Sequence, residues 1–207
     1  FTSKVTEAGM DIRFLKNRIG VDATWFTNLN GPRIYTLLLA PSTGFSSFLL
    51  NGVNTRKTGY EVSVNGSVLK NPKGLNWNVM ANWSTFQEKY VSIYGDQKML
   101  NAFVGVGDRV DKIYGSAFVR TPDGQIINGP DGRPIVNPTQ QYLGNASADW
   151  VWGINNSFSY KGINLSFQFD GRVGGKMIDY IQQQTFRGGR NILTTQGAMG
   201  EARYQDY

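Results

Sequence analysis

Apolar and polar residues alternate with a period of two over several stretches of this chain of 207 residues. In the segment 149–174, apolar side chains alternate with Asn, Ser and Gln on either side of Lys161-Gly162. Successive side chains of a β-strand point to opposite sides of the sheet, so this alternation is typical of strands with one apolar and one polar face. The pattern predicts strands at about residues 4–15, 19–27, 55–69, 75–86, 149–160 and 163–174.

The connections between these strands alternate in length. Three short turns close three hairpins, whereas the remaining connections are long, at residues 28–54, 87–148 and 175–207. Soluble sandwiches keep most connections to a few residues, while outer-membrane barrels combine short turns on one side with long loops on the other. The sequence therefore predicts an all-β fold, a segment of a transmembrane antiparallel β-barrel. A soluble two-sheet protein with one solvated face also explains the alternation.

Aromatic residues fall on the apolar side of the predicted strands, in two groups. Amphipathic rings favour the two membrane interfaces, so two groups separated along the strands are expected of a barrel. The predicted interface aromatics are Trp25, Tyr60, Trp83 and Trp152 toward the long loops, and Trp77 and Tyr160 near the short turns.

The opposite, polar side of the strands carries mainly Asn, Ser and Gly, as expected for a water-filled lumen. The candidate lumen residues are Glu61, Asn155, Asp170 and Arg172. Asp170 and Arg172 stand two residues apart on one strand, so they point the same way and are placed to form an ion pair.

An apolar patch interrupts the first long loop. Its prominent members are Leu37, Leu38, Leu39, Phe45 and Phe48. Exposed apolar patches mark interaction sites, so this segment is expected either to cap the barrel mouth or to contact a partner protein.

Composition excludes histidine and cysteine chemistry. The chain has no Cys and no His, so thiolate nucleophiles, Ser–His mechanisms and the commonest metal sites cannot be built. We expect no catalytic residue, no cofactor and no metal site. The formal net charge is +6, but the excess lies on the three short turns, whose charged residues are all basic, and not in a stripe suited to nucleic acid. These five are Lys16, Arg18, Lys70, Lys73 and Lys161.

Four segments carry distinctive residues: Gly144-Asn-Ala-Ser-Ala-Asp-Trp150, the hairpin from Asn155 to Gly175 with its Tyr160-Lys161-Gly162 turn, the upstream Ile113-Tyr114-Gly115, and Thr58-Gly59-Tyr60-Glu61. These segments resemble the SusC/RagA family of TonB-dependent transporters. The similarity extends over nearly the whole chain, and the chain resembles a part of the C-terminal half of the family's barrel. Ala148 departs from the pattern, because the family usually carries Pro there.

The resemblance implies a barrel of about 22 strands with an N-terminal plug that is not part of this sequence, so the chain is expected to be one piece of a larger protein. It further implies active import of oligosaccharides or oligopeptides across the bacterial outer membrane. The implied partners are TonB, acting through the plug region, a SusD-like surface lipoprotein that forms a lid, and the lipid bilayer. Two alternatives stay open: a passive porin-like barrel, and a soluble β-sheet module that binds glycans or acts as an adhesin.

Overall fold

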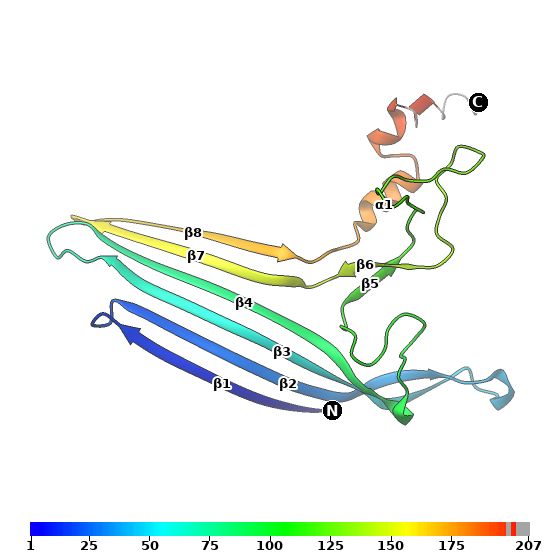
Figure 1. Ribbon diagram of the computed structural model, residues 1–207, viewed down its shortest axis with the longest axis horizontal. Helices are drawn as coiled ribbons and strands as arrows, with labels where there is room; N and C mark the ends of the chain where they lie inside the picture. The colour runs from blue at the N-terminus through cyan, green and yellow to red at the C-terminus, as the bar shows by residue number, and fades with distance from the viewer. Residues whose placement is uncertain (198–199, 202–207) are drawn as a thin grey trace. The chain divides into compact units, whose positions relative to one another are not determined.

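A computed structural model of the chain describes residues 1–197 and 200–201. The chain divides into two compact units, residues 1–175 and residues 176–207. The first unit contains all the strands, and the second contains a short helix, so each is described by itself (Figure 1).

Six antiparallel strands form the main sheet of the first unit, in the order β1-β2-β3-β4-β7-β8 (Figure 1). Their bounds are β1 Thr2–Phe14, β2 Ile19–Leu38, β3 Ser47–Leu69, β4 Asn76–Ile93, β7 Ala148–Tyr160 and β8 Ile163–Gly174. Each strand lies beside its neighbour in sequence, except that the connection from β4 to β7 contains a small two-stranded sheet. The two strands of that sheet are β5 Lys112–Gly115 and β6 Gln141–Asn145.

Short turns join the strands at one end of the sheet, as the alternation predicts. The β1–β2 turn places Leu15, Lys16 and Asn17 in the left-handed region, with φ of 49°, 57° and 64°. The Arg18 side chain then crosses to β3 and donates to the carbonyls of Ser67 (3.1 Å) and Val68 (3.0 Å). This clamp joins the first turn to the neighbouring hairpin.

The first long connection differs from the loop expected at residues 28–54. β2 continues to Leu38 and β3 begins at Ser47, so most of this segment is a hydrogen-bonded hairpin that ends in a 3-10 turn, η1 Pro41–Thr43. Register shifts between Asn30 and Ile34 mark where this extension leaves the regular sheet, next to a cis peptide bond between Gly31 and Pro32. Alternation missed the hairpin because apolar residues occupy both of its faces.

The other two long connections also contain structure. β4 continues to Ile93 and is followed by η2 Tyr94–Asp96, so residues 87–93 belong to a strand rather than to the loop expected at 87–148. The expected loop 175–207 contains helix α1 Tyr180–Arg187, capped by Asp179, whose Oδ1 accepts from the Gln182 N–H at 2.8 Å, and the 3-10 turn η3 Ile192–Thr195. Residues 198–199 and 202–207 of that expected loop lie outside the described residues.

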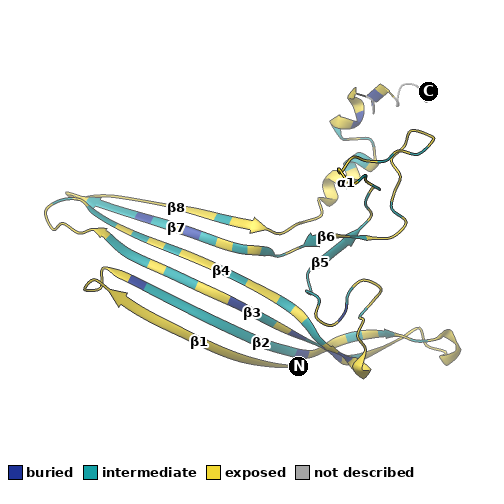
Figure 2. Cartoon of the chain, in the orientation of Figure 1, coloured by how far each residue is buried: buried dark blue, intermediate teal, exposed yellow. Residues whose placement is uncertain are grey.

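The sheet has almost no interior of its own. Val53 and Ile93 are the only buried apolar side chains among the described residues, while Figure 2 shows exposed positions along β1 and β8. A soluble sandwich would bury one face of this sheet, and the described chain leaves both faces uncovered.

No helix among the described residues has the length and apolar character needed to cross a membrane.

Candidate functional site

The strand register places the four candidate lumen residues on one face of the sheet. Directly paired residues of antiparallel strands point to the same side. Glu61 pairs with Ser84, Ser84 with Val151, and Val151 with Arg172. Asn155 and Asp170 lie an even number of residues from Val151 and Arg172, so they share this side, which we call the polar face.

A shallow hollow of about 750 Å³ occupies the middle of the sheet. Its lining includes Glu61, Asp170 and Arg172, with Ser and Thr side chains between them. Gly153 is buried below the hollow, and a Cβ there would lie 2.6 Å from Asn82 Oδ1 and 2.8 Å from Asp170 Oδ1. The absence of a side chain at Gly153 therefore lets these two polar groups approach each other across three strands.

Some charged residues on this face have an ion-pair partner, and others do not. Arg13 forms ion pairs with Asp11 at 2.7 Å and with Asp22 at 3.2 Å, so these two carboxylates share one guanidinium. Asp170 does not form the expected ion pair with Arg172; instead Gln168 Nε2 donates to both of its oxygens at 2.8 and 3.0 Å.

Glu61 and Arg172 take no part in the ion pairs of the described residues. They lie three strands apart in one row, about 14 Å at the usual strand spacing. The hollow therefore presents the charges of Glu61, Asp170 and Arg172, none of them in an ion pair of the described residues, with Ser and Thr hydroxyls nearby, a surface suited to holding polar solutes weakly.

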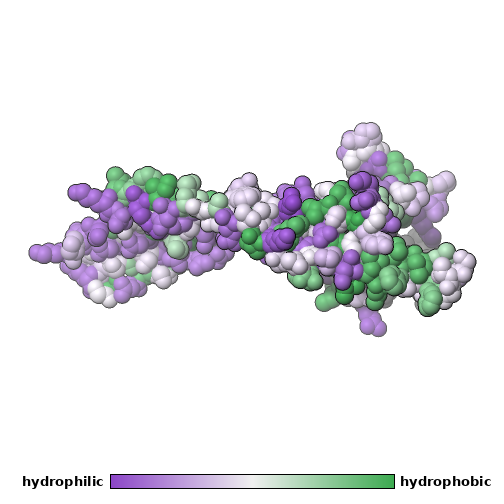
Figure 3. All heavy atoms as spheres, turned by 90° about the horizontal axis from the view of Figure 1, so that it is seen from below, coloured by the Kyte–Doolittle hydropathy of each residue, from purple (hydrophilic) through white to green (hydrophobic). Residues whose placement is uncertain are grey.

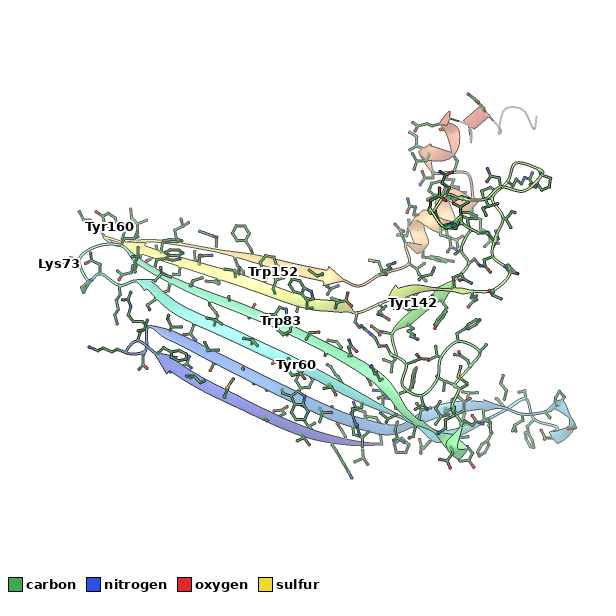
Figure 4. All side chains as sticks on the ribbon, in the orientation of Figure 1. Tyr60, Lys73, Trp83, Tyr142, Trp152 and Tyr160 are labelled. Carbon is green, nitrogen blue, oxygen red and sulfur yellow. The ribbon has the colours of Figure 1, made fainter. Side chains whose placement is uncertain are left out.

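The predicted interface aromatics lie on the other side of the sheet, which we call the apolar face. Trp25 pairs with Tyr60, and Trp83 pairs with Trp152. Figure 4 shows Tyr60, Trp83 and Trp152 in the central part of the sheet. Near the short turns, Trp77 stacks on Phe158 with ring centroids 5.4 Å apart, and Tyr160 ends β7.

The spacing between the two aromatic groups fits a bilayer. Trp152 and Tyr160 are eight residues apart on β7, which is about 26 Å along a strand and about 20 Å along a barrel axis at a tilt near 40°. Outer-membrane barrels have an apolar band of about 25 Å. The aromatic placement therefore agrees with the predicted interfaces, which stay a prediction.

Two features of these faces were missed at the level of sequence. Asn156 lies on the apolar face, where Trp77 Nε1 donates to its Oδ1 at 3.2 Å. Phe26 and Phe86 lie on the polar face, and the Lys57 ammonium stands 3.9 Å above the Phe86 ring. In both cases the signal was a polar or aromatic doublet (Asn155-Asn156, Trp25-Phe26) that breaks strict alternation.

Two glycines accommodate aromatic rings from the paired strand. A Cβ on Gly59 would lie 2.5 Å from Phe26 Cζ, and one on Gly171 would overlap the indole ring of Trp152. Each ring lies over the backbone of its partner, a packing that strengthens a strand pair containing glycine. A shift of the register by one residue would bring a side chain under either ring, so these pairs favour the observed register.

The predicted partner-contact residues lie in and around the extended hairpin rather than in a loop. Leu37 pairs with Phe48, Leu39 follows the end of β2, and Phe45 lies in the tip. The opposite face of the hairpin is the more exposed one, with Ile34 at 75%, Leu38 at 80% and Leu49 at 65% of full exposure. Hydrophobic atoms are prominent at this end of the molecule in Figure 3.

Polar contacts fix the base of this hairpin. Arg33 bonds Glu88 Oε1 at 2.6 Å, and the hydroxyl of Thr55, which is 1% exposed, donates to the same oxygen at 2.5 Å. These contacts tie β2, β3 and β4 together where the extension begins.

A second cluster holds the long connection between β4 and β7. Arg109 donates to both oxygens of Asp111 at 2.9 and 2.8 Å, and the Ser147 N–H donates to Asp111 at 2.9 Å. Burial alone would raise the pKa of Asp111, but these hydrogen bonds outweigh it and lower the pKa to about 2. Lys112 bonds Asp108 at 2.5 Å and lies over the Tyr142 ring, so the cluster joins the start and the end of the loop.

Comparison with known proteins gives a consistent result, although no family model matches the chain. It is 22% identical over 221 residues to TonB-dependent receptor P3 of Formosa agariphila, covering 92% of this chain and 22% of that protein. It is 21% identical over 204 residues to TonB-dependent receptor P26 of the same organism, covering 85% of this chain and 20% of that protein. The chain thus spans about a fifth of the length of these curated relatives.

Solved structures of the RagAB peptide transporter share the fold. The chain superposes on one with a TM-score of 0.59 at 16% identity, covering 81% of this chain and 20% of that one. For the RagAB peptide importer in its open-open state, the TM-score is 0.64 at 16% identity, covering 84% and 20%. The sheet has the fold of a barrel segment in these structures. The resemblance to SusC/RagA-type TonB-dependent transporters seen in the sequence is confirmed by these similarities.

Proposed function

We propose that this SusC/RagA-like sheet is part of the barrel wall of an active importer in the bacterial outer membrane. The observation that carries the proposal is the two-faced sheet: one face is apolar with two aromatic groups, the other polar with a shallow hollow, and no packed layer covers either among the described residues. The similar proteins are named as receptors and transporters, which supports a role in transport rather than catalysis.

Within this proposal, the polar face forms part of the cargo path. Glu61, Asn155, Asp170 and Arg172 are proposed to face the lumen. The cargo is an oligosaccharide or an oligopeptide. The similar RagAB structures are titled as a peptide transporter and importer, which supports the second class. Energy comes from TonB through a plug region outside this chain, and a SusD-like lipoprotein acts as the lid.

Cell fractionation and uptake assays test the proposal against its alternatives. An outer-membrane importer stays in the membrane fraction until detergent is added, and a protonophore or loss of TonB abolishes its uptake of labelled cargo. Uptake that continues without TonB would instead indicate a passive porin-like barrel. Recovery of the intact protein in the soluble fraction without detergent would contradict the barrel and favour the soluble β-sheet alternative.

The extended hairpin is proposed to contact the lid lipoprotein. Replacing Leu37, Leu38 and Leu39 with Ser is expected to weaken capture of the lipoprotein by the intact transporter. Leu38→Ser alone is expected to lower the affinity at least about tenfold, because burying a leucine contributes about 1.5–3 kcal/mol. Leu165→Ser, on the bare apolar face of β8, serves as the matched control and should leave capture unchanged. Unchanged capture by the triple variant would remove the hairpin from the interface.

A further inference from the structure

Basic side chains lie in one row on the apolar face, beyond the aromatic residues on the long-loop side. Arg56 of β3 pairs directly with Lys89 of β4, and Leu29 pairs with both Arg56 and Lys4 of β1. Arg56 lies four residues from Tyr60, so its side chain shares the face of that aromatic residue. The row therefore belongs to the surface that the barrel would turn toward lipid.

The cations of this row have no acidic partner among the described ion pairs. Like charges directly opposite each other on paired strands are destabilising, and Arg56 and Lys89 occupy such positions. Their acidic neighbour Glu88 is on the polar face, where Arg33 and Thr55 already bond it. A bound anion between Arg56 and Lys89 would convert this repulsion into attraction.

A hollow of about 470 Å³ adjoins the two cations. Its lining includes Arg56, Thr58, Gln87 and Lys89, and Gly107 from the following loop contributes to its wall. The loop is fixed there by backbone hydrogen bonds, since Gly107 N donates to the Tyr90 carbonyl at 2.8 Å and Tyr90 N donates to the Asp108 carbonyl at 3.0 Å. The site thus combines one guanidinium and one ammonium group with hydroxyl and amide groups in a recess.

In the proposed membrane orientation, this row of cations lies at the level of the lipid headgroups. Arg56 and Tyr60 are four positions apart, which is about 13 Å along the strand and about 10 Å along the membrane normal at a tilt near 40°. Aromatic side chains of such barrels lie at the interface, so cations about 10 Å farther out meet phosphates rather than acyl chains. Thr58 and Gln87 lie between these levels, where sugar hydroxyls would accept and donate hydrogen bonds.

We propose that Lys4, Arg56 and Lys89 bind the phosphates of a phosphorylated glycolipid, the lipopolysaccharide of the outer leaflet. The inference rests on the proposed function, because the long-loop side must face outward. An anionic phospholipid of the inner leaflet would meet the short turns at the opposite end of the strands. Cargo would meet the polar face, on the other side of the sheet.

Binding of purified lipopolysaccharide to the detergent-solubilised intact protein tests this inference. Arg56→Gln with Lys89→Gln is expected to lower the affinity at least about tenfold, and the remaining affinity should depend less on salt. The matched control is Lys73→Gln with Lys161→Gln on the short turns, which removes the same charge and should leave the affinity unchanged. Heat-modified gel migration verifies that both variants form the barrel.

A second measurement uses no variant. Dephosphorylated lipopolysaccharide should bind the unmodified protein at least about tenfold more weakly, and phosphatidylglycerol vesicles should not compete. Equal affinity for both forms of the glycolipid, equal loss in the two double variants, or preference for phosphatidylglycerol would each overturn the inference. These results leave the proposed function intact, whereas recovery of the protein without detergent would remove both.

Discussion

The bond between Trp77 and Asn156 allows a quantitative test of the apolar face. Asn156 lies four residues from both Trp152 and Tyr160, so it occupies the middle of the proposed membrane span. The residue is 9% exposed, and its Oδ1 accepts from Trp77 Nε1 at 3.2 Å. Trp77→Phe keeps a ring that can stack on Phe158 but removes this donor.

Removing the donor is expected to be costly because the acceptor stays buried. A buried acceptor that loses its partner costs about 1–3 kcal/mol, and the smaller ring loses some packing in addition. We therefore expect Trp77→Phe to destabilise the intact protein by about 2–4 kcal/mol. In an Asn156→Val background the acceptor is gone, and the same substitution should cost only about 1–2 kcal/mol.

Urea-dependent folding into lipid vesicles, followed by gel migration, measures all four proteins of this cycle. The coupling between the two positions should be about 1–2 kcal/mol. If Trp77→Phe costs the same in the unmodified protein and in the Asn156→Val background, the hydrogen bond contributes nothing and the argument from burial is wrong.

Three further predictions concern the faces, the loop and the register. Ile154→Arg, on the apolar face, should impair assembly in membranes, by up to about 2–4 kcal/mol at the midplane, whereas Asn155→Arg on the polar face should be tolerated; equal tolerance would contradict the assigned faces. The low pKa of Asp111 stabilises the β4–β7 loop above the ordinary value of 3.8, and this contribution is lost as the pH falls toward about 2. Limited proteolysis should therefore show loop cleavage increasing between about pH 4 and pH 2, and Asp111→Asn should show that sensitivity already at about pH 7. Gly171→Val should destabilise folding strongly because its Cβ would overlap the Trp152 ring, and unchanged urea resistance would contradict the described packing.

The sequence allowed the strands with one apolar and one polar face to be predicted, together with the shared face of Glu61 and Arg172. Alternation reports burial on one side, so it could not detect the hairpin extension, where Ile34 and Tyr35 are adjacent and both faces are apolar. Backbone hydrogen bonds hold that extension together, and they impose no pattern of polar and apolar residues on the sequence. The same limit hid Asn156, because its partner Trp77 belongs to a strand 79 residues away.

The cluster around Asp111 was beyond prediction for a different reason. Its members Arg109 and Ser147 are brought together by a long connection whose path alternation does not define. The row formed by Lys4, Arg56 and Lys89 likewise depends on the register between strands, so it emerged only from the structure.

The extension of the β2–β3 hairpin has a mechanical consequence. Its two strands pair from Arg33 and Val53 to Leu38 and Ser47, which makes a ladder about 17–20 Å long. A paired ladder resists bending along its length, whereas the irregular register at its base is the natural point of rotation. A rotation of about 10° at that point would displace the tip by about 3 Å. A protein holding the tip would therefore apply a torque directly to the Arg33–Glu88–Thr55 contacts at the rim of the sheet.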